Sequence, residues 1–371
     1  MTITIERYTN DHVPAVREFN KRIKAGGSSY RIPESPVSNW LPQRDSIPLY
    51  VQYFVALEGN TVRGMYILKP QAFACNGEVT MIAGYHLPIS EGVVDSCYAL
   101  VGFLMLKDAL KRQPLLFGLG GGSYDEPIAR MLKAMKWSMF SCPFYFKVNH
   151  PFGFLREIIY LRHKRSMRII LDSLAFSGLG WMAIKSLQSL RGLTQRAAAD
   201  CRSEEVENFS LWADEIWKQA KDHYAMIAVR DAATLNTLYP SSNDRFRRIK
   251  VLRRGKVIGW AVMLNTKMRD NKYFGSLRVG SVVDCLAISG EESQVVAMAT
   301  QALESSGVDI IVTNQLHRSW CKAFSDNGYL VGPSNLIFAV SPQLAQKLHP
   351  FDRNVSNVHV TRGDGDGPYN L

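Results

Sequence analysis

Residues 114–137, PLLFGLGGGSYDEPIARMLKAMKW, carry the pattern that decides the fold. Residues 115–119 form an apolar run as long as one buried strand, and the glycines at 120–122 free the backbone after it. Pro127 suits the first turn of a helix, where its missing amide would have no partner. Apolar side chains then recur at helical spacing up to Trp137. The stretch predicts a strand, an open loop, an amphipathic helix and an aromatic end.

The same order occurs a second time about 190 residues later. Residues 308–312 (VDIIV) predict the strand, 313–317 the loop, 318–324 the helix, and 327–329 (NGY) the end. Two hairpins also match, because VALEGNTVRGMYI and VLRRGKVIGWAVM each have glycine at the turn and again shortly after it. These repeated patterns indicate one fold used twice.

Composition narrows the class of protein. A chain of 371 residues is too long for one ordinary core, and 46% hydrophobic with 21% charged residues is typical of globular proteins. The formal net charge of +11 favours anionic partners, although a basic protein without such a partner has the same composition. Six scattered cysteines without metal-ligand spacing predict reduced thiols in the cytoplasm and no metal site. No run of apolar residues is long enough to predict a membrane-spanning helix.

The predicted elements run strand, helix, hairpin, strand, helix, strand, helix, strand, and then largely repeat. This order predicts an α/β (α+β) fold with two mixed sheets in tandem, joined by a helical linker. The expected boundaries are 1–150 for the first domain, 151–203 for the linker, 204–345 for the second domain and 346–371 for a C-terminal tail. Residues 142–148 (CPFYFKV) are expected to be the last strand of the first domain.

The linker allows two interpretations. It combines a basic segment with the apolar run IILDSLAFSGLGWMAI at 169–184. In the first interpretation its apolar face packs on the two domains. In the second, residues 153–191 lie as a basic amphipathic element on an anionic membrane surface, and the protein is peripheral to the inner face of the membrane.

The order of elements resembles the fold of the GCN5-related N-acetyltransferases (GNAT), here twice in tandem. The helix followed by an aromatic end at 129–137 and at 322–329 is similar to the closing signature of that family. The second half also resembles tandem acyltransferases of bacterial polysaccharide gene clusters, through Asp214, Trp217, Arg230, Asp231 and residues 362–366. A more distant resemblance is to the FemAB-like transferases, which use aminoacyl-tRNA.

The GNAT resemblance implies acetyl-CoA or another acyl-CoA as co-substrate. In that family the loop after the central strand binds pyrophosphate at a helix N-terminus. The corresponding cofactor-binding residues are His86, Leu87, Ser90 and Gly92 in the first half and Ala287, Ser289 and Gly290 in the second. Each loop has one glycine and two acids, and carboxylates repel pyrophosphate.

Four side chains are candidates for catalysis. Tyr124 and Asp125 lie where a GNAT substrate would meet the thioester, as acid and base, although packing and helix capping also explain them. Asp284 lies inside an apolar strand, where it is either a base facing a cleft or the partner of a buried group. His317 follows the second copy of the strand and is a candidate base or a surface loop residue.

The sequence therefore favours an acyl-CoA-dependent N-acyltransferase acting on an amine of a small molecule, such as an amino sugar, or of a glycan precursor. One alternative is a FemAB-like transferase, for which tRNA would be the partner. The other is a scaffold without catalytic activity at the membrane surface. The half that carries the activity is left open.

Overall fold

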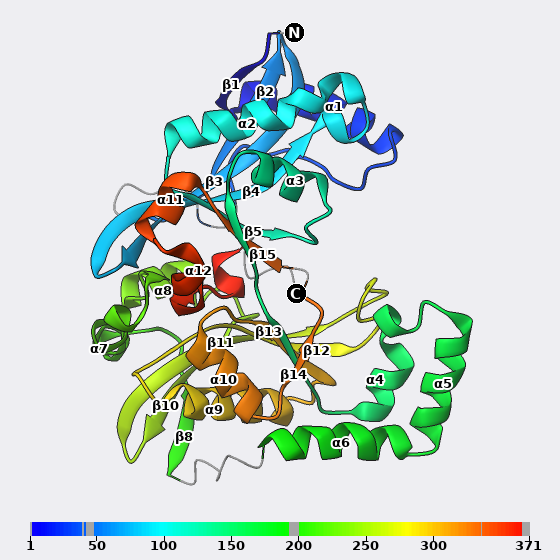
Figure 1. The fold of residues 1–371 in the computed structure, drawn as a ribbon, viewed down its shortest axis with the longest axis vertical. Coiled ribbons are helices and arrows are strands. Elements are labelled where there is room, and N and C mark those ends of the chain that lie inside the picture. The colour runs from blue at the N-terminus through cyan, green and yellow to red at the C-terminus, as the bar shows by residue number, and fades with distance from the viewer. Residues whose placement is uncertain (1, 39–40, 42–47, 193–199, 335, 366–371) are drawn as a thin grey trace. The chain divides into compact units, whose positions relative to one another are not determined.

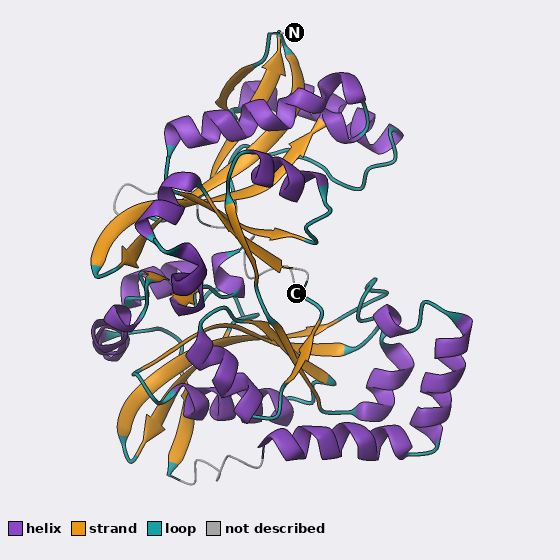
Figure 2. Ribbon diagram, viewed as in Figure 1, coloured by secondary structure: helices purple, strands orange, loops and turns teal. Residues whose placement is uncertain are grey.

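The computed structural model describes residues 2–38, 41, 48–192, 200–334 and 336–365. The chain divides into two compact units (Figure 1). Unit 1 comprises Met1–Ser141 and Ile337–Asn354, and unit 2 comprises Cys142–Leu336 and Val355–Leu371. In each unit a twisted sheet with parallel and antiparallel strand pairs is packed against helices (Figure 2). This arrangement confirms the predicted α/β class with two mixed sheets.

The sheet of unit 1 has the strand order β1-β2-β3-β4-β5-β15-β6. Its strands are β1 (Thr4–Arg7), β2 (Gln52–Glu58), β3 (Thr61–Cys75), β4 (Glu78–Ser90), β5 (Leu116–Gly121), β15 (Leu336–Val340) and β6 (Ser138–Ser141). Its helices are α1 (Val13–Ala25), α2 (Ala99–Arg112), α3 (Pro127–Ala134), α11 (Pro342–Lys347) and α12 (Phe351–Asn354). The predicted hairpin is the pair β2 and β3, which turns at Gly59 with a φ of 57°.

Helices cover both faces of this sheet because successive side chains of β3 point to opposite sides. Tyr66 and Leu68 pack with Val101 and Met105 of α2 on one face. Met65 and Ile67 pack with side chains of α1 on the other face (Val16, Phe19, Ile23). The spacing of three and four residues in α1 is the helical period expected from the sequence.

The sheet of unit 2 has the strand order β14-β7-β13-β12-β11-β10-β8. Its strands are β14 (Leu330–Gly332), β7 (Phe144–Val148), β13 (Ile310–Asn314), β12 (Arg278–Ala287), β11 (Lys256–Lys267), β10 (Arg247–Arg253) and β8 (Cys201–Glu205). Two short strands, β9 (Met226–Ala228) and β16 (Val358–His359), pair in parallel. The helices are α4 (Pro151–Glu157), α5 (Arg165–Phe176), α6 (Leu179–Gly192), α7 (Leu211–Ala220), α8 (Ala232–Leu238), α9 (Glu292–Ser305) and α10 (Arg318–Asp326).

The two units exchange one strand. The predicted last strand of the first domain, β7, lies in unit 2 between β13 and β14, and its place in unit 1 is taken by β15, which pairs with β6. The assignment of residues 142–148 to the first sheet was therefore wrong. FYFKV and LIFAV are both strands of five mostly apolar residues, so the local sequence pattern does not distinguish the two sheets. The chain divides differently from the contiguous ranges 1–150 and 204–345 expected from the sequence.

The predicted linker largely consists of helices α4, α5 and α6, which belong to unit 2. Leu155, Leu171 and Ala175 pack with residues of β12 and β13 in one hydrophobic cluster. Residues 201–203, expected at the end of the linker, instead belong to edge strand β8. Residues 193–199 of the linker and 366–371 of the tail lie outside the described part of the chain. In that part no single helix is long and apolar enough to cross a membrane, and α5 with residues 179–190 passes such a test only as a pair bent by 81°.

Candidate active site

The central parallel strands of unit 2 pair only at their beginnings. Val279–Ser281 of β12 lie beside Ile310–Val312 of β13, and no further pairing between the two strands occurs in the described chain. Beyond Ser281, β12 keeps its partner β11 on its other side. In unit 1 the parallel pairing is also short, with Ala83 and Gly84 in the middle of β4 opposite Leu116 and Phe117 at the start of β5. In both units the central parallel strands therefore pair over only a short stretch.

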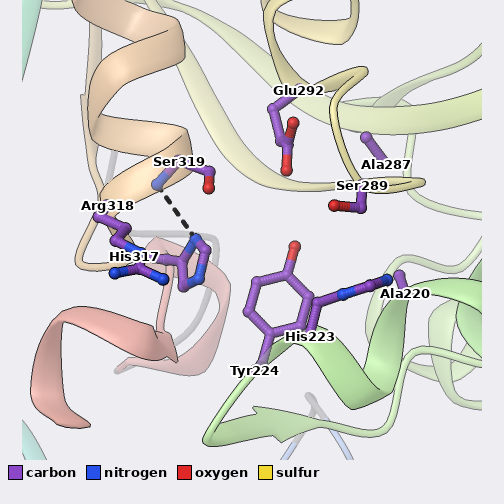
Figure 3. A pocket seen from close by; sticks show the side chains of 9 residues that line it. All are labelled: Ala220, His223, Tyr224, Ala287, Ser289, Glu292, His317, Arg318 and Ser319. Carbon is purple, nitrogen blue, oxygen red and sulfur yellow. Dashed lines mark hydrogen bonds between the residues drawn. The ribbon is translucent and has the colours of Figure 1, made fainter.

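A pocket of about 140 Å³ lies at the open end of β12 in unit 2 (Figure 3). It is lined by Ala220, His223, Tyr224, Ala287, Ser289, Glu292, His317, Arg318 and Ser319. Glu292 is the first residue of α9 and Arg318 is the first residue of α10, so the N-termini of two helices meet at the pocket. Helix N-termini carry partial positive charge, which favours an anionic group here.

His317 is the N-cap of α10, and its imidazole faces the pocket (Figure 3). Its Nδ1 accepts the amide N–H of Ser319 at 3.3 Å. Burial and the neighbouring Arg318 lower the pKa of His317 to about 4, so the ring is neutral near pH 7. Because Nδ1 accepts a hydrogen bond, the proton of the neutral ring is on Nε2. The geometry makes His317 a hydrogen-bond donor toward a ligand.

Tyr224 lies beside His317, with the two ring centroids 4.6 Å apart in an edge-on arrangement. Its hydroxyl oxygen accepts the indole N–H of Trp320 at 3.1 Å, and Figure 3 shows it pointing toward Glu292. Burial raises the pKa of Tyr224 well above its ordinary value. The hydroxyl keeps its proton and is a second donor in the pocket.

The pocket also contains charged groups of both signs. Arg318 lies opposite the carboxylate of Glu292 (Figure 3), whose Oε2 accepts the amide of Gly290 at 3.0 Å. The neighbouring Glu291 is paired with Arg253 at 2.9 Å. Among the described residues, no group of three His, Cys, Asp or Glu side chains is placed to hold a metal ion.

The structure brings together three of the predicted site residues of the second half. Ala287, Ser289 and His317 line one pocket, although 28 residues separate Ser289 from His317. Gly290 adopts a positive φ of 90° in the same loop, where its amide is bonded to Glu292. The loop after β12 and the loop after β13 meet because the two strands are adjacent and parallel.

Asp284 does not line this pocket. Its side chain is fully buried and lies 2.8 Å from Nε of Arg230, and Tyr239 donates a hydrogen bond to it at 2.8 Å. Desolvation and the nearby Asp364 raise the pKa of Asp284, although Arg230 opposes the shift. Of the two roles expected from the sequence, this geometry fits the partner of a buried group.

The free edge of β12 at Cys285 is already occupied. The amide of Cys285 donates to the carboxylate of Asp284 at 3.0 Å, and its carbonyl lies 3.0 Å from Nε2 of His359. Burial lowers the pKa of His359 to about 3, so this ring is neutral near pH 7. Space for an extended ligand along β12 therefore begins beyond Cys285, at Ala287.

In the corresponding loop of unit 1, the side chains of Ser90 and Glu91 are hydrogen-bonded to other groups of the same unit. Ser90 accepts the amide of Gly92 at 3.0 Å through its Oγ, at the start of a short 3-10 turn (Glu91–Val93). The carboxylate of Glu91 is buried and receives hydrogen bonds from Arg22 at 2.7 Å and Arg63 at 2.9 Å. Desolvation opposes ionisation, but these two hydrogen bonds hold the pKa of Glu91 below its ordinary value.

The other predicted site residues of unit 1 lie in different environments. His86 is buried with its ring edge-on to Phe117, while Leu87 is exposed and has a positive φ of 42°. Tyr124 is 48% exposed, and Asp125 lies in an exposed loop after β5. None of these four lines the pocket described above.

Sequence reasoning missed Tyr224, Arg318 and His223 as pocket residues, and treated Glu292 only as a repelling acid. Arg318 could have been found, because it begins the helix that follows the predicted loop. Tyr224 and His223 precede β9, and no local pattern connects them with a helix almost 100 residues later.

Solved structures of similar fold cover most of the chain. A conserved protein from Enterococcus faecalis V583, described as a probable N-acyltransferase, has 9% identity and a TM-score of 0.51, covering 94% of this chain and 74% of its own. A GCN5-related N-acetyltransferase from Anabaena variabilis ATCC 29413 has 10% identity and a TM-score of 0.51, with 91% and 72% covered. N-myristoyltransferase from Saccharomyces cerevisiae with bound myristoyl-CoA and inhibitors has 11% identity and a TM-score of 0.50, with 91% and 79% covered.

At these identities the similarity concerns the fold alone. The chain has the fold of the GCN5-related N-acetyltransferases, as the order of its elements predicted. No protein-family model matches the sequence, and the search of curated proteins gave no match.

Proposed function

We propose that the protein is an acyltransferase that moves an acyl group from coenzyme A to an amine, and that the reaction takes place in unit 2. The proposal is carried by the parting of β12 from β13 after Ser281, with a pocket at the open end between two helix N-termini. The acyl-CoA donor is further supported by the fold, since structures that share it are described as N-acyltransferases.

On one side, the charges of the pocket fit a group on which negative charge develops. The first residues of α9 and α10 contribute the positive ends of two helix dipoles, and Arg318 adds a full positive charge. Glu292 repels an anion, whereas Glu291 is neutralised by Arg253. The carbonyl oxygen of an acyl thioester is therefore expected beside Arg318 and the N-terminus of α10, and the pyrophosphate of coenzyme A, a pantetheine arm away, lies outside this pocket.

The donors of the pocket fit the chemistry of acyl transfer. An acyl thioester supplies an electrophilic carbonyl carbon and a thiolate leaving group. Nε2–H of His317 and the hydroxyl of Tyr224 donate to the carbonyl oxygen as negative charge develops on it. His317 thus polarises the carbonyl by donating a hydrogen bond to it. Glu292 acts as the general base and accepts a proton from the attacking amine. The nitrogen–carbon bond forms, the carbon–sulfur bond breaks, and the amine proton ends on the sulfur.

The acceptor in this proposal is a primary amine of an amino sugar or glycan precursor. A panel of glucosamine, nucleotide-linked amino sugars, polyamines and amino acids separates this class from other amines. Formation of the amide with acetyl-CoA is followed by mass spectrometry. If only polyamines or amino acids are acylated, an amino sugar is not the acceptor, but the proposed acyl transfer to an amine still holds.

Isothermal titration of the full chain with acetyl-CoA tests the donor and its site. Arg318→Ala is expected to weaken binding about tenfold, because the positive charge beside the thioester carbonyl is lost. The matched control is Lys322→Ala, one turn further along α10, where the lysine is exposed and paired with Asp326. The proposal is overturned if acetyl-CoA at millimolar concentration neither binds nor raises the melting temperature, since a ligand of the native state must stabilise it.

A further inference from the structure

Helices α4, α5 and α6 of unit 2, with the turn Ile159–Leu161, expose an unusual amount of apolar surface. Eleven of the 23 large apolar side chains that are exposed in the described chain lie between Phe152 and Leu190. Five of them surround the corner between α5 and α6 and are here called the corner patch: Phe152 (48%), Phe176 (69%), Leu179 (55%), Trp181 (55%) and Met182 (51%). Apolar patches of this kind mark interaction sites.

The corner patch is continuous across the helices. The rings of Phe152 in α4 and Phe176 in α5 meet edge-on with centroids 5.6 Å apart. The guanidinium of Arg156 lies 5.8 Å from one ring centroid and 5.4 Å from the other. Leu179 begins α6 only three residues after Phe176 ends α5, so the apolar surface continues around the corner.

The opposite sides of these helices are buried in unit 2. Leu155 of α4 and Leu171 and Ala175 of α5 belong to a cluster with Val279 of β12 and Ile310 of β13. Spacing on α5 separates the two sides, since Ile169, Ile170 and Phe176 are exposed while Leu171 is 6% exposed. The exposed side of these helices is therefore distinct from the buried side that packs on the sheet.

Positive charge accompanies this apolar surface. Residues 156–188 contain six Lys and Arg against two acids. One acid, Asp172, is paired with Arg162 at 2.7 Å. Lys164, Arg165 and Arg168 lie exposed at the start of α5, the helix whose other end carries Phe176 of the corner patch.

We propose that this surface docks on an anionic lipid bilayer, with the corner patch inserted among the lipids and the basic start of α5 on the headgroups. Trp, Phe and Leu beside Lys and Arg are the composition of helices that lie in the bilayer interface. The excess of positive charge complements an anionic leaflet, to which each basic residue adds attraction. Helices α5 and α6, of 12 and 14 residues, are bent by 81° relative to each other, so both are short enough to lie in the plane of a membrane surface.

Flotation of the full chain with lipid vesicles tests the proposal. Wild type is expected to float with vesicles of phosphatidylcholine containing about one third phosphatidylglycerol, more weakly with phosphatidylcholine alone, and less at high salt. The triple variant F176S/L179S/M182S is expected to remain in the dense fraction. The matched control L211S/V331S removes two exposed apolar side chains (80% and 57%) elsewhere in unit 2 and is expected to float like wild type.

The charged part is tested with K164Q/R165Q/R168Q against the control K218Q/K256Q/K322Q. The first is expected to weaken vesicle binding about a hundredfold, or about fivefold per charge, and the second much less. The proposal is overturned if the wild-type protein does not bind anionic vesicles. It is also overturned by a dimer in light scattering that F176S/L179S/M182S converts to a monomer while vesicle binding is absent, because the surface would then bind protein.

Discussion

Nε of Arg230 lies 2.8 Å from Oδ2 of Asp284, and neither side chain is exposed to solvent. A second buried carboxylate, that of Asp364, lies 2.6 Å from Nη2 of the same guanidinium. One cation therefore holds two acids from β12 and from the segment that follows β16. A buried charge that loses its partner is costly, so these contacts predict a structural role for Asp284.

Asp284→Ala is expected to lower the free energy of unfolding by about 3–5 kcal/mol, because Arg230 loses one of its two partners inside the protein. Asp284→Asn is expected to cost less, since the amide keeps the shape and Asp364 still holds the guanidinium. Urea unfolding measures both, and Lys218→Ala is the control, because its pair with Glu215 is exposed and worth less than about 1 kcal/mol. An Asn variant with wild-type stability and no activity would instead identify Asp284 as a catalytic base.

His317→Gln is expected to retain most of the activity, because the amide also presents an N–H to the ligand. His317→Phe is expected to reduce kcat about a hundredfold through loss of a donor to the carbonyl oxygen. The ratio of wild-type to Gln kcat/KM should stay constant between about pH 5 and 8, since a ring with a pKa of about 4 is neutral throughout. A ratio that rises with pH through about 6.5 would show that the imidazole is a base.

Acid is expected to destabilise the protein through its two buried neutral imidazoles. The pKa values of His317, about 4, and His359, about 3, lie below the value of 6.5 for an unfolded histidine. Between these values the unfolded state binds the extra protons, so stability is complete above pH 6.5 and falls as the pH drops toward 3. The loss for His317 alone is about 3 kcal/mol.

Urea unfolding at several pH values measures this dependence. His317→Gln and His359→Gln should each flatten the curve in the acid range, whereas His163→Gln, at an exposed position, should leave it unchanged. A wild-type curve without slope between pH 6.5 and about 4 would contradict the buried neutral state of both rings.

The exchanged strands predict that neither half of the chain folds alone. Breaking the chain between residues 192 and 200 leaves β15 on one fragment and the rest of the unit 1 sheet on the other, and it separates β7 from unit 2. The two fragments are expected to give a folded complex when they are expressed together. Cooperative thermal unfolding of residues 1–192 by themselves would refute the exchange.

Much of the fold could be predicted from the sequence, because its signals are local. The hairpins, the helical period of α1 and the strand, loop and helix around His317 depend on residues close in the chain. Ala287, Ser289 and His317 were named separately from the sequence, and they meet because the loops that hold them follow adjacent parallel strands.

The remaining features depend on contacts distant in sequence. Asp284 could not be assigned because its partners Arg230 and Asp364 lie 54 and 80 residues away. The strands β7 and β15 are both short and mostly apolar, so the choice of sheet depends on packing rather than on sequence period. Tyr124 and Asp125 matched the position of a family site, but the structure leaves them in an exposed loop.

The central claim is that the parted end of β12 and β13 holds an acyl-CoA. Hydrogen exchange of the full chain, followed by mass spectrometry with and without saturating acetyl-CoA, tests it directly. The account predicts slower exchange in residues 287–293 and 315–319 of unit 2, with residues 87–95 of unit 1 unchanged. Protection confined to residues 87–95, or no protection in any peptide, would contradict it.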